Sequence, residues 1–131
     1  MDTLDFFKLQ AKNFMRDFKT QYTDETGIYQ YTPRFFPDID EIIVSFDIKE
    51  DDFTLMNCQH IIARLSGFEK WSDLLHASKD KLELGKLLFE NRHIRDSLIE
   101  DWETYRASMN QDVDDRTLIS IFKLVYLDQN E

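Results

Sequence analysis

The apolar residues of this chain recur mainly at intervals of three and four, the spacing that places side chains on one face of a helix. Over residues 3–20 this spacing gives a continuous apolar stripe with lysines and an arginine on its flanks. The stripe consists of Leu4, Phe7, Ala11, Phe14, Met15 and Phe18. A basic amphipathic helix can lie on a membrane surface. Because aspartates stand among these basic residues, we predict instead a helix packed in the protein core.

Residues 54–77 carry the clearest signals of where helices begin and end. Three-and-four spacing predicts a helix over residues 55–65, with Thr54 as its N-cap. The expected buried face consists of Leu55, Cys58, Ile61, Ile62 and Leu65. Gly67 is expected at the C′ position beyond this helix, because glycine adopts a positive φ at little cost. Trp71 starts a second short helix and is expected to be largely buried, so that the two helices form a central helical hairpin.

The chain between the first helix and this central stretch is less regular. Over residues 21–37, Gly27 and two prolines interrupt the pattern. Here Ile28, Tyr29 and Tyr31 fit either a short strand or an extended segment lying on the helices. The sequence leaves these two structures open.

A second helix start is indicated at residue 38. Asp38 and Glu41 have the spacing of a capping box, in which the cap and the third helical residue satisfy each other's backbone amides. The apolar face that follows consists of Ile39, Ile42, Ile43 and Phe46. Residues 47–52 are mostly acidic and predict a solvated connection.

Beyond the central stretch the pattern is again helical. Ser78 is an expected N-cap, and apolar residues at helical spacing follow over residues 82–89 and 94–109. An unbroken helix over residues 79–107 would exceed the usual length of roughly 8–20 residues. The sequence therefore leaves open whether this region is one helix or two, separated by a break near Arg92.

Residues 110–115 are mostly polar and acidic, which predicts a loop, and the residues after them predict a last helix. Asp114 or Asp115 is its expected cap, and a strand is the alternative because the segment is rich in β-branched residues. Its apolar face consists of Leu118, Ile121, Phe122 and Val125. The whole pattern predicts an all-α fold, residues 1–131 forming one compact domain of five to seven helices, with one short extended segment near residues 28–31.

Composition agrees with a folded domain and restricts its partners. Hydrophobic residues make up 42% of the 131 residues, too many for a disordered chain. The formal net charge of −10 repels phosphate backbones and anionic lipid, and it favours either a basic protein partner or simple solubility. One cysteine excludes an intramolecular disulfide, and neither a signal sequence nor a membrane-spanning run is present. We therefore expect a cytoplasmic protein without a membrane partner; association with a second copy stays open.

The pattern A-R-x-x-G-F-x-x-W-x-x-L stands here as Ala63, Arg64, Gly67, Phe68, Trp71 and Leu74. It resembles a small helical module of many bacterial proteins, some of them described as relatives of the glyoxalase superfamily. That module often opens with an L-K-x-x-A-K-x-L helix, to which Phe7, Lys8, Ala11, Lys12 and Phe14 correspond. Lys70 stands where the module often has Ser or Asn. The matched residues are mostly packing residues, so the resemblance implies a helical fold and a bacterial origin, and no activity.

Residues that could carry chemistry form no complete set. Glu90 and His93 make one E-x-x-H pair, whereas di-iron bundles use two such pairs and two further glutamates. Cys58 and His60 point apart on a helix, and Cys58 lies on the expected apolar face. We interpret His60, His76 and His93 as surface or helix-end residues. The sequence therefore predicts no catalytic, cofactor-binding or metal-binding residue, and no cofactor.

A helix-turn-helix is the sharpest alternative use of the central stretch. A recognition helix needs an apolar anchor where Asp73 stands, and the candidate helix offers only Lys70 as a base. An ordinary helical hairpin is therefore preferred. We expect a non-catalytic interaction or regulatory module of a bacterial cytoplasm; the alternative is a nucleic-acid-associated regulator using a helix-turn-helix-like hairpin, and an enzyme ranks third.

Overall fold

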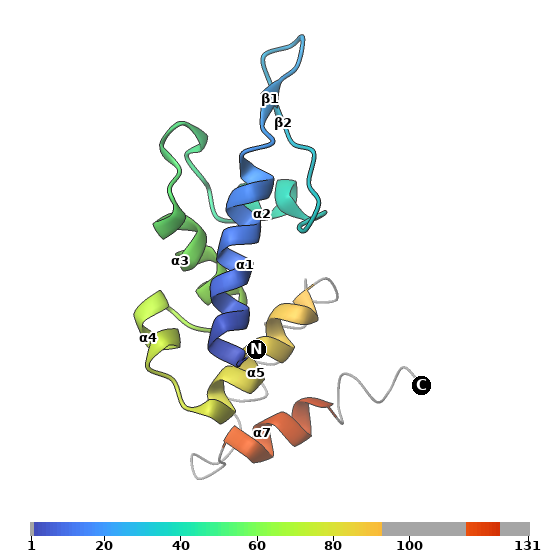
Figure 1. Cartoon of the computed structure of the whole chain (residues 1–131). Helices are drawn as coiled ribbons and strands as arrows, with labels where there is room; N and C mark the ends of the chain where they lie inside the picture. Colours follow the sequence, from blue (N-terminus) through green and yellow to red (C-terminus); the bar gives the residue numbers. More distant parts are fainter. Residues whose placement is uncertain (1, 93–114, 124–131) are drawn as a thin grey trace. The chain divides into compact units, whose positions relative to one another are not determined.

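The computed structural model describes residues 2–92 and 115–123, which contain six α-helices and one two-stranded sheet (Figure 1). The described chain is mostly helical, as predicted. It divides into two compact units, unit 1 over Met1–Arg64 and unit 2 over Leu65–Glu131. The expected apolar face over residues 94–109 and the polar loop over residues 110–114 lie outside the described residues. One domain over residues 1–131 stays a prediction.

Helix α1 (Thr3–Phe18) confirms the first predicted helix, although it ends two residues earlier than expected, before its C-cap Lys19. Asp2 caps it, because its carboxylate accepts from the amide of Asp5 at 2.8 Å. Four residues of the predicted stripe are buried, namely Phe7, Ala11, Phe14 and Phe18. The apolar face of α1 is therefore used in packing, as predicted.

After α1 the chain forms a hairpin of β1 (Tyr22–Thr23) and β2 (Tyr29–Gln30), which continues beyond the C-terminal end of α1 (Figure 1). The strands are antiparallel, with Tyr22 opposite Gln30 and Thr23 opposite Tyr29. Of the two structures that the sequence left open for this segment, the strand is the one that forms. Gly27 has a φ of +82° in the turn, a conformation that glycine adopts without steric cost.

Helix α2 (Ile39–Ser45) begins where predicted, but the expected capping box is wrong, since Asp38 makes no side-chain cap hydrogen bond. The helix ends in a Schellman motif: the amide of Ile48 donates to the carbonyl of Ile43 at 3.1 Å, and that of Asp47 donates to Val44 at 3.2 Å. Asp47 occupies the C′ position with a φ of +50°. None of residues 47–52 is buried, as expected for a solvated connection, and the segment includes a short 3-10 helix, η1 (Glu50–Asp52).

Helix α3 (Leu55–Leu65) has the predicted bounds. Thr54 caps it reciprocally with Asn57: the amide of Asn57 donates to Thr54 Oγ1 at 3.4 Å, and the amide of Thr54 donates to Asn57 Oδ1 at 2.8 Å. Its buried residues are Cys58, Ile61, Ile62 and Ala63. Leu55 was wrongly placed on the buried face, since it is 41% exposed in the first turn.

Aromatic rings fill the core of unit 1. Phe18 packs on Phe53 with ring centroids 4.2 Å apart and on Tyr31 at 5.6 Å. Phe14 meets Phe36 edge to face at 5.2 Å. Such pairs add about 0.5–1.5 kcal/mol beyond the area they bury. They connect α1 to the segments before α2 and before α3.

In unit 2, Gly67 has a φ of +87°, which confirms its predicted left-handed conformation. Helix α4 (Trp71–Leu75) follows, and its N-cap Lys70 makes no side-chain cap hydrogen bond. Trp71 is half-buried and not largely buried as expected. In this short helix the fully buried position belongs to Leu74, at 0% exposure.

Helix α5 (Lys79–Glu90) begins at the predicted cap, where Ser78 Oγ accepts from the amide of Lys81 at 3.2 Å. It ends before its C-cap Asn91, in agreement with the break considered near Arg92. Helix α7 (Asp115–Phe122) packs on α5 and shows that the alternative of a strand was wrong. The predicted face of α7 omitted Ile119, which is 3% exposed.

No described helix combines the length and the apolar character needed to cross a membrane.

Candidate functional site

The base of the β-hairpin is held on η1 by two tyrosines. Tyr29 donates its hydroxyl proton to Asp51 Oδ1 at 2.8 Å, and Tyr31 donates to Glu50 Oε2. Gln21 Nε2 donates to the hydroxyl of Tyr31 at 2.8 Å and to Glu50 Oε2 at 3.2 Å. These bonds join residues far apart in sequence, so they fix the direction in which the hairpin leaves α1.

Both tyrosines remain neutral donors. The hydrogen bond to Asp51 and the charge of that carboxylate raise the pKa of Tyr29. Burial, and then the hydrogen bond to Glu50, raise the pKa of Tyr31. Each phenol is protonated at neutral pH and can donate the hydrogen bond that holds the hairpin on η1.

Asp17 binds the segment that follows the hairpin from inside unit 1. This carboxylate is 1% exposed and accepts three backbone N–H bonds, from Arg34 at 2.9 Å, Phe35 at 2.9 Å and Phe36 at 2.6 Å. A carboxylate with several amide donors satisfies polar groups that burial would otherwise leave unpaired. Asp17 thereby attaches the segment that leaves β2 to the last turn of α1.

The hairpin turn is organised around a second carboxylate. Asp24 Oδ1 accepts from the amide of Thr26 at 2.8 Å, from the Thr26 hydroxyl at 2.6 Å and from the amide of Ile28 at 3.0 Å. Gln30 Nε2 donates to Oδ2 at 3.1 Å. The Thr26 hydroxyl, then the other donors, lower the pKa of Asp24 to about 2. The turn is therefore held by a charged acceptor at neutral pH.

Two exposed apolar side chains lie on the side of the hairpin that faces away from η1. Side chains alternate along a strand, so Tyr29 and Tyr31 point towards η1 and Tyr22, which pairs with Gln30, points to the opposite side. Tyr22 is 54% exposed and Ile28 is 59% exposed. We call Tyr22 and Ile28 the hairpin face.

Unit 1 also contains a hollow of about 330 Å³ between the end of α2 and α3. Half-buried Phe46 and Phe53 and buried Ile61 line it together with the exposed carboxylates of Asp47 and Asp52. Lys49, Asn57 and His60 are further lining residues. We call this the α2–α3 hollow.

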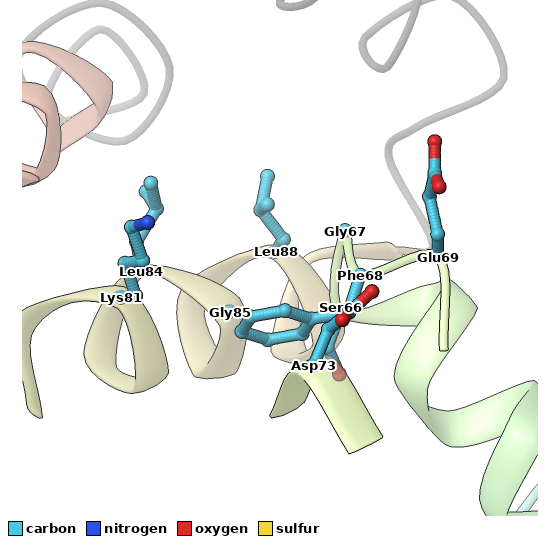
Figure 2. Close-up of a pocket in the computed structure, with 9 residues that line it drawn as sticks. All are labelled: Ser66, Gly67, Phe68, Glu69, Asp73, Lys81, Leu84, Gly85 and Leu88. Atoms are coloured by element: carbon cyan, nitrogen blue, oxygen red, sulfur yellow. The ribbon is translucent and has the colours of Figure 1, made fainter. Parts of the chain in front are cut away.

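Unit 2 has a smaller hollow of about 230 Å³ over α5 (Figure 2). Phe68, Leu84 and Leu88 give it apolar walls, and Glu69, Asp73 and Lys81 add charges of both signs. Ligand pockets for small molecules typically measure about 300–1,000 Å³. The α2–α3 hollow reaches that range and this one does not.

The residues considered for chemistry are not brought together. Cys58 is fully buried, and burial raises the pKa of its thiol to about 12, which disfavours the thiolate that a nucleophile requires. His76 is exposed, with Nδ1 2.8 Å from the carbonyl of Ser72. Glu90 is exposed at the end of α5, and its expected partner His93 lies outside the described residues. Within residues 2–92 and 115–123, no three His, Cys, Asp or Glu residues gather where they could hold a metal ion.

The site residues that matter most in unit 1 were missed from the sequence. Asp17 is one of the aspartates that stand among the basic residues of the first helix, and it lies between Phe14 and Phe18 on the apolar stripe. A carboxylate in that position signals a buried acceptor. No comparable local signal marks the pairing of Tyr31 with Glu50, which lie 19 residues apart.

Comparison with protein-family models, with curated proteins and with solved structures finds no match for this chain.

Proposed function

We propose that the chain is a non-catalytic protein-interaction module and that the hairpin face carries the contact. Two observations support this proposal. The side chains of Tyr22 and Ile28 are more than half exposed, and the hairpin that carries them is held in place by the Tyr29–Asp51 and Tyr31–Glu50 hydrogen bonds. Tyrosine is enriched at protein interfaces, where it contributes contact area and few rotamers. A fixed hairpin also loses less conformational entropy when a partner binds.

The partner expected from charge is basic. The chain has a formal net charge of −10, and the acidic residue Asp51 of η1 accepts the hydrogen bond of Tyr29 in the hairpin. Complementary charge accelerates encounter and selects partners more than it adds affinity. Binding should therefore weaken as the salt concentration rises.

The nucleic-acid alternative gains no support from unit 2. Helix α4 has five residues, hence a length of only about 7.5 Å, and Glu69 and Asp73 are exposed beside Lys70. Helices that read a groove place several donors towards phosphates and base edges. A short helix with acids at these positions is poorly suited to that task.

Several finer predictions remain proposals that rest on the sequence pattern. We infer from the A-R-x-x-G-F-x-x-W-x-x-L pattern that the chain is related to the bacterial helical module and acts in a bacterial cytoplasm. The central helical hairpin and the range of five to seven helices rest on helical spacing and on the position of Gly67.

The intact immobilised chain, exposed to a bacterial lysate, tests the proposed contact. We compare the wild type with a Tyr22→Ser, Ile28→Ser variant and with a Val44→Ser, Met56→Ser control, whose original side chains are 80% and 77% exposed. Proteins identified by mass spectrometry should bind to the wild type and the control and be lost from the hairpin variant. If all three chains retain the same proteins, the hairpin face is not the contact.

A further inference from the structure

The walls of the α2–α3 hollow combine aromatic rings with carboxylates. Phe53 packs one side of its ring on Phe18, with centroids 4.2 Å apart, and remains half-buried where it lines the hollow. Phe46 is also half-buried there, and Asp47 and Asp52 are exposed lining residues. Aromatic faces attract cations, and carboxylates pair with them. The chemistry of these walls therefore suits a cationic group that has an apolar stem.

The backbone conformation of Asp47 favours glycine over aspartate. Asp47 is the C′ residue of the Schellman motif that ends α2, with a φ of +50°. Glycine is the usual residue there because a side chain disfavours the left-handed conformation. Aspartate therefore occupies a position where glycine is usual, and Asp47 is one of the residues that line the hollow.

We propose that the α2–α3 hollow receives an arginine side chain of the partner protein. Its guanidinium would lie against Phe46 or Phe53 and bond to Asp47 or Asp52. This inference rests on the proposed interaction function and names the group that the partner contributes. Arginine is chosen over lysine because a planar guanidinium both stacks on an aromatic ring and bonds a carboxylate through two N–H groups.

Charge and size agree with this occupant. Among the described residues that line the hollow, Lys49 is the one lysine or arginine, against two aspartates, so an anionic ligand would meet net repulsion. A volume of about 330 Å³ lies at the low end for ligand pockets, which suits one side chain better than a large cofactor. The whole chain, at −10, attracts cations as well.

The hollow and the hairpin share one turn of the chain. Glu50 and Asp51 accept the hydrogen bonds of the hairpin tyrosines, and the next two residues, Asp52 and Phe53, line the hollow. The hollow therefore adjoins the side of the hairpin that faces η1, opposite the hairpin face, and a partner that contacts both has to reach around the hairpin.

The test uses the intact isotope-labelled chain and three short capped peptides, in which glycines and serines flank an arginine, a lysine or the neutral analogue citrulline. The arginine peptide should shift the amide resonances of Asp47, Asp52 and His60 saturably, and more strongly than the lysine peptide. Citrulline should cause no saturable shift. Asp52→Asn should weaken arginine binding about tenfold, the loss expected for one bond to a charged group. Glu25→Gln removes an equal charge from the hairpin turn and should leave the affinity unchanged.

Absence of saturable shifts, or equal shifts from the citrulline peptide, would overturn the proposal. Equal weakening by Glu25→Gln and Asp52→Asn would show diffuse attraction to an acidic surface and would overturn it too. Asp47→Gly should weaken binding without unfolding the chain, which separates a lost ligand contact from a lost fold. The Tyr22→Ser, Ile28→Ser variant should bind the arginine peptide as the wild type does. Loss of peptide binding in this variant would place the peptide on the hairpin face and would refute the arginine site. Retention of the lysate proteins by the same variant would refute the hairpin contact.

Discussion

Gly67 and Gly27 have nearly the same backbone conformation, at φ +87° and +82°, but different surroundings. A Cβ at Gly67 would stand 3.0 Å from Leu88 Cδ1, whereas a Cβ at Gly27 would have nothing within 4 Å. Gly67→Ala should lower the free energy of unfolding by about 1 kcal/mol or more, although alanine is the better helix former. Gly27→Ala should cost less, because only the backbone strain remains.

Urea denaturation of both variants checks this prediction. The difference between them measures the contact with Leu88, since the cost of a positive φ is common to both. A more stable Gly67→Ala chain would mean that α3 can continue through this residue, and the predicted helical hairpin would then lose its basis.

At Asp47 we expect the opposite effect on the free energy of unfolding. Its φ of +50° at the C′ position of α2 favours glycine, so Asp47→Gly should raise the free energy of unfolding by about 0.5–1 kcal/mol. Asp47→Ala should destabilise the protein, because alanine keeps a Cβ and adopts the left-handed conformation less readily than aspartate does. Thermal denaturation of the pair decides: two variants that shift the melting temperature in the same direction contradict the assignment.

At the scale of elements, the segment after β2 depends on Asp17. Asp17→Asn keeps the shape but places an amide group among three backbone donors, so it should cost about 2–3 kcal/mol. Hydrogen exchange at the amides of Arg34, Phe35 and Phe36 should accelerate in the same variant. Asp5→Asn, on an exposed residue of the same helix, is the control and should cost less than about 1 kcal/mol. Unchanged exchange in Asp17→Asn would show that the carboxylate does not hold this segment.

The hairpin turn should respond to acid. Its donors lower the pKa of Asp24 from 3.8 to about 2, so the folded hairpin binds this proton more weakly than the unfolded chain does. The contribution of Asp24 is therefore fully present above about pH 4 and is lost as the pH falls towards 2. An NMR titration of the Asp24 carboxyl carbon should give a midpoint near 2, and Asp24→Asn should remove the acid sensitivity of the turn resonances. A midpoint near 3.8 would mean that the turn bonds are not maintained in solution.

At the scale of the whole molecule, the charge of −10 predicts weak contact with nucleic acid. At physiological salt, the intact chain should not bind a labelled random duplex more tightly than about 1 μM, the upper range of ordinary non-specific affinity. Fluorescence anisotropy with a basic DNA-binding protein as positive control measures this. Saturable binding below that concentration would revive the helix-turn-helix alternative.

The positions where several helices begin and end follow from local sequence signals. Thr54, Gly67 and Ser78 mark boundaries that the structure confirms, and α3 has the predicted bounds. A cap bonds backbone groups within about four residues, and helical apolar spacing repeats every three or four residues. A short stretch of sequence therefore contains both signals of a helix boundary. The mainly helical class follows from the same local information.

Which side chains meet depends on how distant segments of the chain fold together. Asp17 reaches the amide of Arg34 across 17 residues, Tyr31 reaches Glu50 across 19, and Tyr29 reaches Asp51 across 22. Leu55 fits the apolar spacing of α3 and is still exposed, because burial depends on what the rest of the chain places against that face. The hairpin face and the α2–α3 hollow arise from the path of the chain between elements, where spacing carries no information about distant partners.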